Sequence, residues 1–529
     1  MISWCGMRRL ERFTPASISS TGTTYPRSLG RSSFSFCSIS PASFRLLFYS
    51  RLDLYVANGI DVMIVMGDVP WAFVNVTSEG CQNFGCQYLP PDDPKEFGTW
   101  IGALAQHVLE SYGVEYASRV QWRLGTEGNG PRWGDHGKYY NQYLESYIAA
   151  VKAIKQVTPK ARVGASNWVE VIRPGASGNF SHGGSDGFQF DFYGAIANDS
   201  SIPLDWISIS HYGGGSAGTD TGANFPGADY IERTPYESRG LIEIDAMRAR
   251  AKRPDATLEI QEWGILNNEK GQPTQEPSSL GAAWTAASAT RWICEADVNK
   301  IFHWHEGVSI RNSSHYGGDN RIVQFYEAWA WDMALLELFI GGVPRYATFD
   351  LMMPSKTSSV KRKDVQATPS SGEVKLNGTI AIIESAVGDD ELYVLVSALG
   401  VKRESPFRTT MTWNTSGALH SCVGGAVAMQ QYVMNASTSV IETVVRELTG
   451  TPGMLIHDDG LAYSFSKLLT PAGIAYVQQP ENLERYWDMQ AKGLQPTAYE
   501  GALKWSSKDL ELTFDVTAPS VTVVVAKCK

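Results

Sequence analysis

The sequence predicts an α/β protein: a (β/α)8 barrel of the TIM type, followed by an antiparallel β-sandwich. In residues 51–345, short apolar runs alternate with longer helix-like segments, which is typical of parallel βα units. Several of these runs end in a polar or acidic residue beside glycine, as barrel strands end at a catalytic face. In residues 346–529 the pattern changes to short alternating β runs separated by turn residues, which is typical of a sandwich.

Residues 1–50 are unlike the rest of the chain. They contain twelve Ser, six Arg, no Lys and a single acidic residue. No apolar h-region lies near Met1, so a standard signal peptide is not visible. The composition fits a transit peptide and equally an N-terminus in which native sequence has been lost or replaced. Residues 44–49 can serve as a strand, but no convincing first strand and helix precede them, so the opening unit of the barrel is left without predicted elements.

Six βα units are predicted from residue 51 onward. Residues 52–58 have the pattern of a helix end, with Gly59 as its cap. Residues 62–66 are apolar throughout, which is typical of a parallel strand buried on both faces. Gly113 is expected to end the first full helix. The predicted strands are 62–66, 120–125, 162–165, 204–210, 256–261 and 300–303, and the predicted helices are 96–111, 140–156, 236–251, 280–296 and 324–340.

The C-terminal region is predicted to be a β-sandwich in a supporting role, with sugar binding as the functional alternative. It holds no clustered acid pair and no metal-ligand spacing. Residues 355–371 are expected to form a polar linker or long loop. The predicted strands are 379–385, 391–397, 409–413, 461–465, 474–478, 512–516 and 521–525.

Charge and hydropathy exclude two classes of partner. The net charge is −10, and because residues 1–50 carry +5, the remaining residues carry −15. Residues 51–529 are therefore too acidic to suit the negatively charged backbone of a nucleic acid. No nucleic-acid partner is expected. We find no apolar run of membrane-spanning length, so no membrane span is expected. The 16 Trp and 23 Tyr suit a protein that stacks rings on sugars, although most of them are expected in the core.

Cysteines and sequons bear on the compartment. Cys81 and Cys86 could close a small disulfide loop, and the odd count of seven cysteines leaves at least one thiol unpaired. No second cysteine pair lies at zinc-ligand spacing. Seven Asn-X-Ser/Thr triplets fit a secreted glycoprotein, so we expect the secretory pathway or the extracellular space even though no signal peptide is visible.

Two glutamates lie where a predicted strand ends and a loop begins. Glu127 follows the strand 120–125 and precedes the turn sequence GNGP, and Glu262 follows the strand 256–261. Counted as the third to the eighth strands of a barrel, these are the fourth and the seventh, whose ends point to the same face. Two carboxylates at that face can flank a glycosidic bond, one as proton donor and the other as nucleophile. The sequence therefore predicts a glycosidase centre.

The motifs around these glutamates resemble those of the clan A glycoside hydrolases. LGTEGN at Glu127 resembles the acid/base motif of the clan, and LEIQEWG at Glu262 resembles its nucleophile motif. The segments GDVPWAF, PPDDPKEFGTWIGALAQHV and ISISHYGGG are most similar to glycoside hydrolase family 39 and its relatives, which include β-xylosidases and α-L-iduronidases. The resemblance spans residues 55–345, and the order and spacing of the motifs carry it.

This resemblance implies a retaining double displacement on an oligo- or polysaccharide, without a metal or an organic cofactor. Glu127 would be the acid/base and Glu262 the nucleophile, with carboxyl groups about 5–5.5 Å apart. The clan usually has Asn before and Pro after the acid/base, whereas this chain has Thr126 and Gly128. A Thr hydroxyl cannot reproduce the reach of the amide, and Asn129 is the candidate that could compensate.

The resemblance and the strand ends also suggest residues that bind substrate. His211 and Tyr212 end the sixth strand, where the clan bonds the nucleophile or a sugar hydroxyl, and Trp304 ends the eighth, where the clan often has a Trp floor. Asp68, Trp71 and His136 lie in the loops after strands. Three further tryptophans near strand ends complete the predicted substrate-binding set: Trp133, Trp168 and Trp263.

Other interpretations remain open at this point. His303 and His305 alternate along a strand, but no third metal ligand is identifiable, so hydrogen bonding at the barrel mouth is favoured over a metal site. A barrel that binds carbohydrate but has lost turnover is the main alternative function, and Thr126 and the irregular N-terminus favour it. An unrelated barrel enzyme is the third alternative, in which Glu127 and Glu262 would not face one pocket.

Overall fold

The computed structural model of the 529-residue chain describes 25 stretches and single residues from Leu52 to Cys528. They are residues 52–53, 55–66, 69–70, 73–74, 90–129, 136–169, 187–213, 239–265, 278–295, 298–303, 308–311, 322–326, 328, 335–336, 339, 343–351, 367–368, 378–387, 390–400, 408–415, 419, 427–455, 469–493, 495–505 and 510–528. All structural statements below concern these residues.

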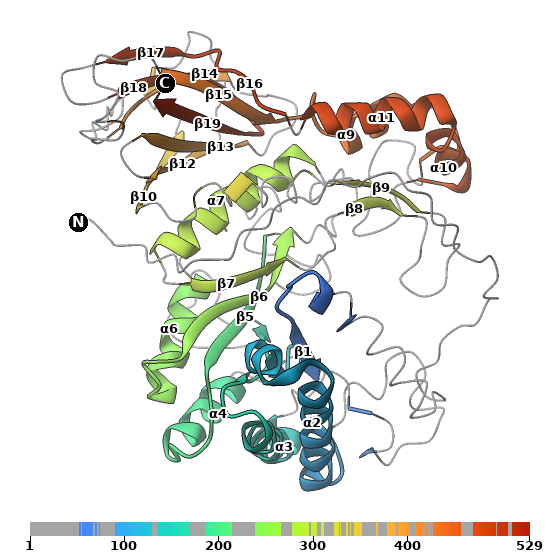
Figure 1. Cartoon of the computed structure of the whole chain (residues 1–529), viewed down its shortest axis with the longest axis vertical. Coiled ribbons are helices and arrows are strands. Elements are labelled where there is room, and N and C mark those ends of the chain that lie inside the picture. The colour runs from blue at the N-terminus through green and yellow to red at the C-terminus, as the bar shows by residue number, and fades with distance from the viewer. Residues whose placement is uncertain are drawn as a thin grey trace.

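A parallel sheet forms the first layer of the molecule. Its strand order follows the chain, each strand lying parallel to the next, and a short extra strand, β4 (Trp168–Val169), pairs with β5. The sheet curls into a half-barrel (Figure 1). The main strands are β1 (Met63–Met66), β2 (Gln121–Leu124), β3 (Arg162–Gly164), β5 (Trp206–Gly213), β6 (Thr257–Ile265) and β7 (Val298–His303). These are the six predicted strands, in the predicted order.

Helices between the strands cover the outer face of this sheet (Figure 1). Alternate side chains explain the layering, since Trp122, Leu124 and Ile260 join the apolar core that the helices share. Most of the predicted helices are present, but α4 was not predicted, and it forms because Phe188 and Phe192 among others are buried. The helices are α2 (Pro94–Arg119), α3 (His136–Val157), α4 (Phe188–Ala197), α6 (Arg239–Ala251) and α7 (Ser279–Glu295).

Helix α2 shows how local sequence sets the boundaries of these elements. Asp93 is its N-cap and accepts hydrogen bonds from the backbone amides of Lys95 (2.8 Å) and Glu96 (3.1 Å). Gly113 has φ 79°, which interrupts the helix as predicted, but helical structure then resumes as far as Arg119. Gly59 likewise has φ 68° after the turn that it was predicted to cap.

The predicted helix 324–340 is wrong at its start. Residues Ile322–Tyr326 form strand β9, which pairs antiparallel with β8 (Val308–Arg311). Phe325 explains the difference: it is fully buried, and its ring lies 5.7 Å from that of Tyr486. A contact so distant in sequence overrides the local helix pattern.

Two antiparallel sheets make up the C-terminal region. Their apolar faces share one core, to which Ile380 and Leu392 contribute from one sheet and Trp413 and Leu512 from the other. The first sheet has the order β10 (Val343–Leu351), β12 (Gly378–Val387), β13 (Glu391–Gly400), β19 (Ser520–Cys528), β15 (Val427–Met434) and β16 (Thr497–Ala498); the second has the order β11 (Ala367–Thr368), β14 (Arg408–Asn414), β18 (Leu510–Thr517) and β17 (Ala502–Trp505).

Three helices extend from the antiparallel sheets: α9 (Val440–Leu448), α10 (Pro471–Val477) and α11 (Pro480–Gly493) (Figure 1). The predicted strand 474–478 is therefore wrong, because these residues lie in α10 and its C-cap. The signal was present locally, since Thr470 accepts a hydrogen bond from the amide of Gly473 (3.1 Å) and Pro471 occupies the first helical turn. The predicted strand 461–465 lies outside the described residues.

Helix α7 lies between the parallel sheet and the antiparallel sheets (Figure 1). On one side Trp284 packs on Trp263 of β6, with ring centroids 5.4 Å apart. On the other side Ser397 of β13 donates a hydrogen bond to the carbonyl of Ala283 (2.6 Å). A helix buried on both sides needs small or apolar side chains on both faces, and α7 is rich in Ala and Trp, with Thr285 and Ser288 as small buried polar residues. In the part of the chain that the structure describes, no helix is long and apolar enough to cross a bilayer.

Candidate active site

A β-bulge in strand β6 determines where Glu262 points. Ile260 pairs with Ile209 of β5, but the next pair is Glu262 with Ser210, so Gln261 is an extra residue in the ladder. Because side chains alternate between the two faces, the extra residue brings both Gln261 and Glu262 to the inner face. Contacts confirm this, since both approach Arg123.

The loop that carries Glu127 has an unusual backbone conformation. Gly125 has φ 87°, and Glu127 has φ 49°, a left-handed value that is uncommon for a residue with a side chain. The segment after β3 holds this loop: the amide of Glu127 donates to the carbonyl of Asn167 (3.0 Å), and the amide of Gly128 donates to Ser166 Oγ (2.8 Å). The chain therefore fixes the backbone of Glu127 in a strained form, as is frequent at functional sites.

A buried tyrosine helps to hold the same loop. The hydroxyl of Tyr143, in α3, donates to the carbonyl of Leu124 (3.0 Å) and accepts from the amide of Ser166 (2.9 Å). Burial raises the pKa of Tyr143 well above its ordinary value, so the phenol stays protonated and can donate at every physiological pH. The ends of β2 and β3 are thus connected through one side chain of the helix layer.

Arg123 connects the loop of Glu127 to Glu262. Its Nη2 atom donates to Thr126 Oγ1 (3.0 Å) and lies 3.8 Å from Glu262 Oε1. Its Nη1 atom donates to Gln261 Oε1 (3.2 Å). Arg123 is 5% exposed and Glu262 is 7% exposed, so this ion pair is largely removed from solvent. The two strand ends predicted to carry the catalytic carboxylates therefore meet at one guanidinium.

Thr126 and Asn129, which depart from the clan motif, both have structural partners. A guanidinium can only donate, so the Thr126 hydroxyl accepts from Arg123 and directs its own hydrogen elsewhere. The Asn129 amide donates to the carbonyl of Val169 (2.9 Å) and accepts from the amide of Val169 (2.8 Å). Because Asn129 is thereby used as a backbone clamp and is 3% exposed, it is not placed to replace the clan asparagine.

Two predicted substrate-binding tryptophans are packed in the core. Trp168 is fully buried and donates from its indole nitrogen to the hydroxyl of Tyr193 (2.8 Å). Trp263 is fully buried against Trp284 and Trp292 of α7. Neither ring has a surface that a sugar could contact in this structure. The alternation along β6 explains Trp263, since the residue after Glu262 faces the helix layer.

His303, at the end of β7, and His211, which lies inside β5 rather than at its predicted end, also face the helix layer. The ring of His211, which is 3% exposed, lies 4.4 Å from that of Trp292. The ring of His303 lies 5.6 Å from that of Trp263. In the described ranges, no group of three or more His, Cys, Asp or Glu side chains could hold a metal ion.

The remaining predicted site residues are only partly placed. Tyr212 lies on β5 opposite Gly264, and His136 begins α3, but the side chains of both lie outside the described part of the structure. Asp68, Trp71, Trp133 and Trp304 lie outside the described residues altogether, as do His305 and the pair Cys81 and Cys86.

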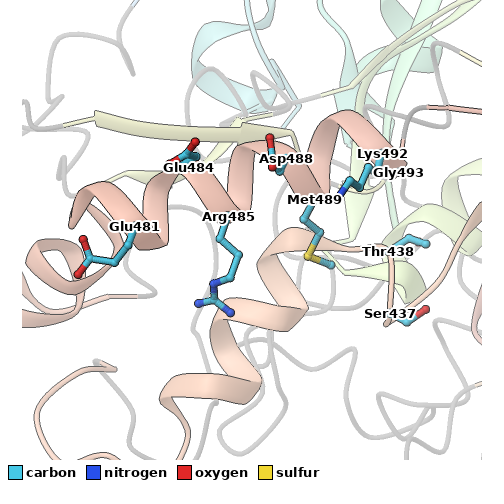
Figure 2. A pocket seen from close by; sticks show the side chains of 9 residues that line it. All are labelled: Ser437, Thr438, Glu481, Glu484, Arg485, Asp488, Met489, Lys492 and Gly493. Atoms are coloured by element: carbon cyan, nitrogen blue, oxygen red, sulfur yellow. The ribbon is translucent and has the colours of Figure 1, made fainter.

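A separate hollow of about 660 Å³ lies on the helical extension rather than at the parallel sheet. It is lined by one face of α11 and by the turn before α9 (Figure 2). Its Arg485 is held by Glu447 through two hydrogen bonds of 2.5 and 2.7 Å. None of its lining residues comes from the parallel sheet, so it is not the site that the two glutamates define. The lining residues are Ser437, Thr438, Glu481, Glu484, Arg485, Asp488, Met489, Lys492 and Gly493.

Sequence reasoning missed Arg123 and Gln261. Both are polar residues that alternate with apolar ones in short strands, Arg123 after Trp122 and Gln261 after Ile260. The overlooked signal was the presence of these polar residues. Parallel strands covered on both faces are usually apolar throughout. Two polar residues at alternate positions in such a strand indicate an inner face with polar contacts.

Comparison with solved structures supports the fold. A monomeric β-xylosidase from Caulobacter crescentus CB15 aligns over 90% of this chain and 83% of its own, with a TM-score of 0.54 and 13% identity. The GH39 enzyme from Xanthomonas axonopodis pv. citri aligns over 90% and 82%, with a TM-score of 0.56 and 13% identity. The bacterial orthologue of human α-L-iduronidase aligns over 92% and 72%, with a TM-score of 0.54 and 12% identity.

These similarities confirm the expected fold, which is that of the clan A glycoside hydrolases, but at such identities they establish the fold alone. No protein-family model and no curated protein matches the sequence.

Proposed function

We propose that this chain is a retaining glycoside hydrolase that cleaves O-glycosidic bonds of an oligo- or polysaccharide. Glu127 is the acid/base and Glu262 the nucleophile. The observation that carries the proposal is the position of Arg123, which is within 4 Å of both Thr126, the neighbour of Glu127, and Glu262. The residue next to Glu127 and the carboxylate of Glu262 thus meet at one guanidinium, which supports two carboxyl groups that flank one glycosidic bond.

The reaction follows from the two carboxyl groups. Glu127 donates its proton to the glycosidic oxygen while a Glu262 oxygen attacks the anomeric carbon, so the bond to the leaving sugar breaks and a glycosyl ester forms on Glu262. Glu127, now ionised, removes a proton from water, and the resulting hydroxide oxygen displaces Glu262 from the anomeric carbon. Because the anomeric carbon is inverted twice, its configuration is retained.

We further propose that the half-barrel is part of an eight-stranded (β/α) barrel that is incomplete or irregular at its N-terminal unit. The six parallel strands in consecutive order support this, since a barrel of this type needs eight. The fold also indicates the class of substrate: the structural neighbours are described as a β-xylosidase, a GH39 enzyme and an α-L-iduronidase orthologue. A β-linked pentoside or a uronic-acid glycoside is therefore the first substrate to test.

Secretion is part of the same proposal. Cys528 is disulfide-bonded, which fits an oxidising compartment. Two of the sequon asparagines, Asn198 and Asn414, are exposed and thus accessible to glycosylation. A polysaccharide substrate is too large to enter most cells, which agrees with an extracellular site of action.

The alternative function is a barrel that binds carbohydrate without turnover. The specific observation in its favour is that Asn129 is clamped to the backbone of Val169, so the amide expected before the acid/base has no replacement there. Thr126 must then supply the contact to the sugar through its single hydroxyl hydrogen.

The deciding experiment is covalent labelling with 2-deoxy-2-fluoro glycosides of xylose, glucose and uronic acids, followed by peptide mapping. A retaining enzyme traps the fluoro-sugar on Glu262, and Glu262→Ala abolishes both the labelling and the hydrolysis of aryl glycosides. Glu442→Gln, which changes a carboxylate on α9 that accepts from the backbone amide of Ser279 at the start of α7, is the matched control and should label as the wild type does. Binding of the sugars without labelling or hydrolysis would support the alternative.

A further inference from the structure

A set of polar side chains continues beneath Glu262 along the inner face of the parallel sheet. Its centre is Glu259 of β6, which is fully buried. Glu259 accepts hydrogen bonds from Gln121 Nε2 (3.0 Å) and Gln261 Nε2 (2.8 Å) and lies 3.4 Å from Arg162 Nη2. We call the following six residues the interior polar column: Gln121, Arg123, Arg162, Glu259, Gln261 and Lys300.

The column is not what a barrel needs for stability. The interiors of such barrels are mainly filled by branched apolar side chains, which pack without any cost of burying charge. Burying a carboxylate and its cations removes them from water, and this cost is seldom exceeded by their attraction. A network of this kind therefore calls for a role other than stability, and specification of one geometry is a role that such networks can have.

The direction of every hydrogen bond in the column is fixed by the charges at its ends. A carboxylate only accepts and a guanidinium or an ammonium only donates. The amide of Gln261 must therefore direct its nitrogen to Glu259 and its oxygen to Arg123 (3.2 Å). The amide of Gln121 must likewise direct its nitrogen to Glu259 and its oxygen to Lys300 Nζ (2.9 Å). Gln261 thus connects Glu259 to Arg123, and Gln121 connects Glu259 to Lys300. The position of Glu259 therefore orients both cations.

At the other end of the column, Arg162 and Lys300 interact with the same carboxylate, that of Glu259. Burial lowers the pKa of Lys300 from its ordinary value, and the charge of Glu259 opposes this effect. Arg162 lies over the ring of Trp206 (5.6 Å) and also bonds Thr257 Oγ1, so it cannot move without disturbing β5 and β6. Glu259 is therefore held in place by partners on several strands.

We propose that Arg123 is a positioning residue for both catalytic carboxylates, and that Glu259 sets the orientation of Arg123 from inside the barrel. Arg123 holds Thr126 with the same nitrogen atom that approaches Glu262, so a rotation of the guanidinium moves the acid/base loop relative to the nucleophile. Gln261 prevents this rotation, and Glu259 fixes Gln261. The inference rests on the proposed function, which it deepens by assigning what sets the spacing of the carboxylates.

The test uses Glu259→Gln, which keeps the size of the side chain but removes the charge that orients both glutamines. Its matched control is Glu384→Gln, another buried glutamate, which accepts a hydrogen bond from Trp413 Nε1 (2.6 Å) in the antiparallel sheets. Arg123→Gln and Arg123→Lys complete the series. Lysine keeps the charge but cannot donate to three acceptors in the fixed geometry of a guanidinium.

We expect Glu259→Gln and Arg123→Lys to lower kcat roughly 10²-fold, because a displacement of about 1 Å of reacting groups costs that much. KM for the same aryl glycoside should change less than about threefold, as for a residue that acts on the transition state only. Arg123→Gln should lower kcat further, and Glu384→Gln should leave kcat unchanged. Equal kcat values for wild type, Glu259→Gln and Arg123→Lys would overturn the inference.

Crystal structures of the wild type, Glu259→Gln and Arg123→Lys provide a readout that does not depend on activity. The inference requires a changed Glu262 carboxylate position or a changed 125–129 loop in both variants. If the wild type hydrolyses no glycoside but the variants show these shifts, the proposed function fails and the positioning role stands. If the wild type is active and the site geometry of both variants is unchanged, the positioning role is overturned and the proposed function stands.

Discussion

Thr126 and Glu262 lie on either side of a single nitrogen atom, Arg123 Nη2, at 3.0 Å and 3.8 Å respectively. The residue before the proposed acid/base and the proposed nucleophile are thus connected, although 136 positions separate them along the chain. This contact gives Thr126 a role that the clan motif does not suggest. Its hydroxyl serves the guanidinium as an acceptor and has one hydrogen left for another partner.

The first prediction concerns this hydroxyl. Thr126→Val keeps the shape of the side chain but removes the acceptor, so Arg123 loses a buried partner and the loop of Glu127 loses its connection to Glu262. We expect kcat/KM to fall roughly 10–10²-fold, which corresponds to about 1.4–2.7 kcal/mol. Thr126→Ser keeps the hydroxyl and is the control, with an expected loss below about threefold. Equal losses for Val and Ser would mean that the methyl group, not the hydroxyl, matters.

A second prediction separates packing from sugar binding at Trp263. The side chain is fully buried against α7, so Trp263→Phe leaves unfilled volume between the sheet and the helix. We expect a loss of about 1–3 kcal/mol in the free energy of unfolding, seen as a lower Tm, with KM unchanged. A raised KM at an unchanged Tm would instead restore Trp263 to the substrate-binding set predicted from the sequence.

The consecutive parallel strands could be predicted because their signal is local. Val120, Trp122 and Leu124 favour a strand by themselves, and Trp122 and Leu124 do form the side of β2 that packs on the helices, with Val120 in the same core just before the strand. The role of the inner-face residues Gln121 and Arg123 depends on their contacts with Glu259 and Gln261 of β6. The pattern of one strand contains no information on the side chains of a strand 130 or more positions away.

The strand that carries Glu262 was predictable, but its end was not, because β6 continues past Glu262 to Ile265, and neither was the bulge that directs Glu262 inward. A bulge is a mismatch between two strands, here β5 and β6, and neither sequence alone records it. Trp263 was assigned to the site because it adjoins Glu262 in sequence, yet neighbours on a strand face opposite sides. The strand predicted at 474–478 failed for a different reason: the helix cap at Thr470 and Pro471 was overlooked.

The third prediction concerns the contact between α2 and α3. A Cβ atom on Gly98 would lie 2.6 Å from Ala149 Cβ and 2.9 Å from the Ala149 carbonyl carbon. Alanine would gain about 1 kcal/mol in helix propensity, but the clash with backbone costs more, so we expect Gly98→Ala to lower stability by about 1–3 kcal/mol. Gly102→Ala, whose Cβ would be 3.0 Å from Ala153 Cβ, is the graded control and should cost less.

Thermal unfolding of the two variants checks this order. Adding Ala149→Gly to Gly98→Ala removes the closest side-chain contact and should recover part of the lost Tm. If Gly98→Ala proved more stable than the wild type, the two helices would have to lie further apart than they do in this structure.

The last prediction is a pH dependence at the helical extension. Glu447 on α9 receives two hydrogen bonds from Arg485 and one from Tyr486 on α11, and the Arg485 pair above all holds the pKa of Glu447 below its ordinary value of 4.5. A carboxyl whose pKa is depressed by folding stabilises the folded state above its unfolded pKa, and this stabilisation is lost as the pH falls through the folded pKa.

Glu447→Gln should therefore lower the Tm of the helical extension at pH 7. The expected loss of stability is only about 1 kcal/mol, because Arg485 is about half exposed and the ion pair is partly screened by water. The difference from the wild type should shrink as the pH falls below 4.5 and through the lower folded pKa of Glu447, because the wild-type carboxyl then also loses its charge. Glu484→Gln, on the exposed side of α11, is the control for removal of charge alone. A deficit of Glu447→Gln that stays constant from pH 7 to pH 3 would show that shape, and not the ionised pair, holds α9 to α11.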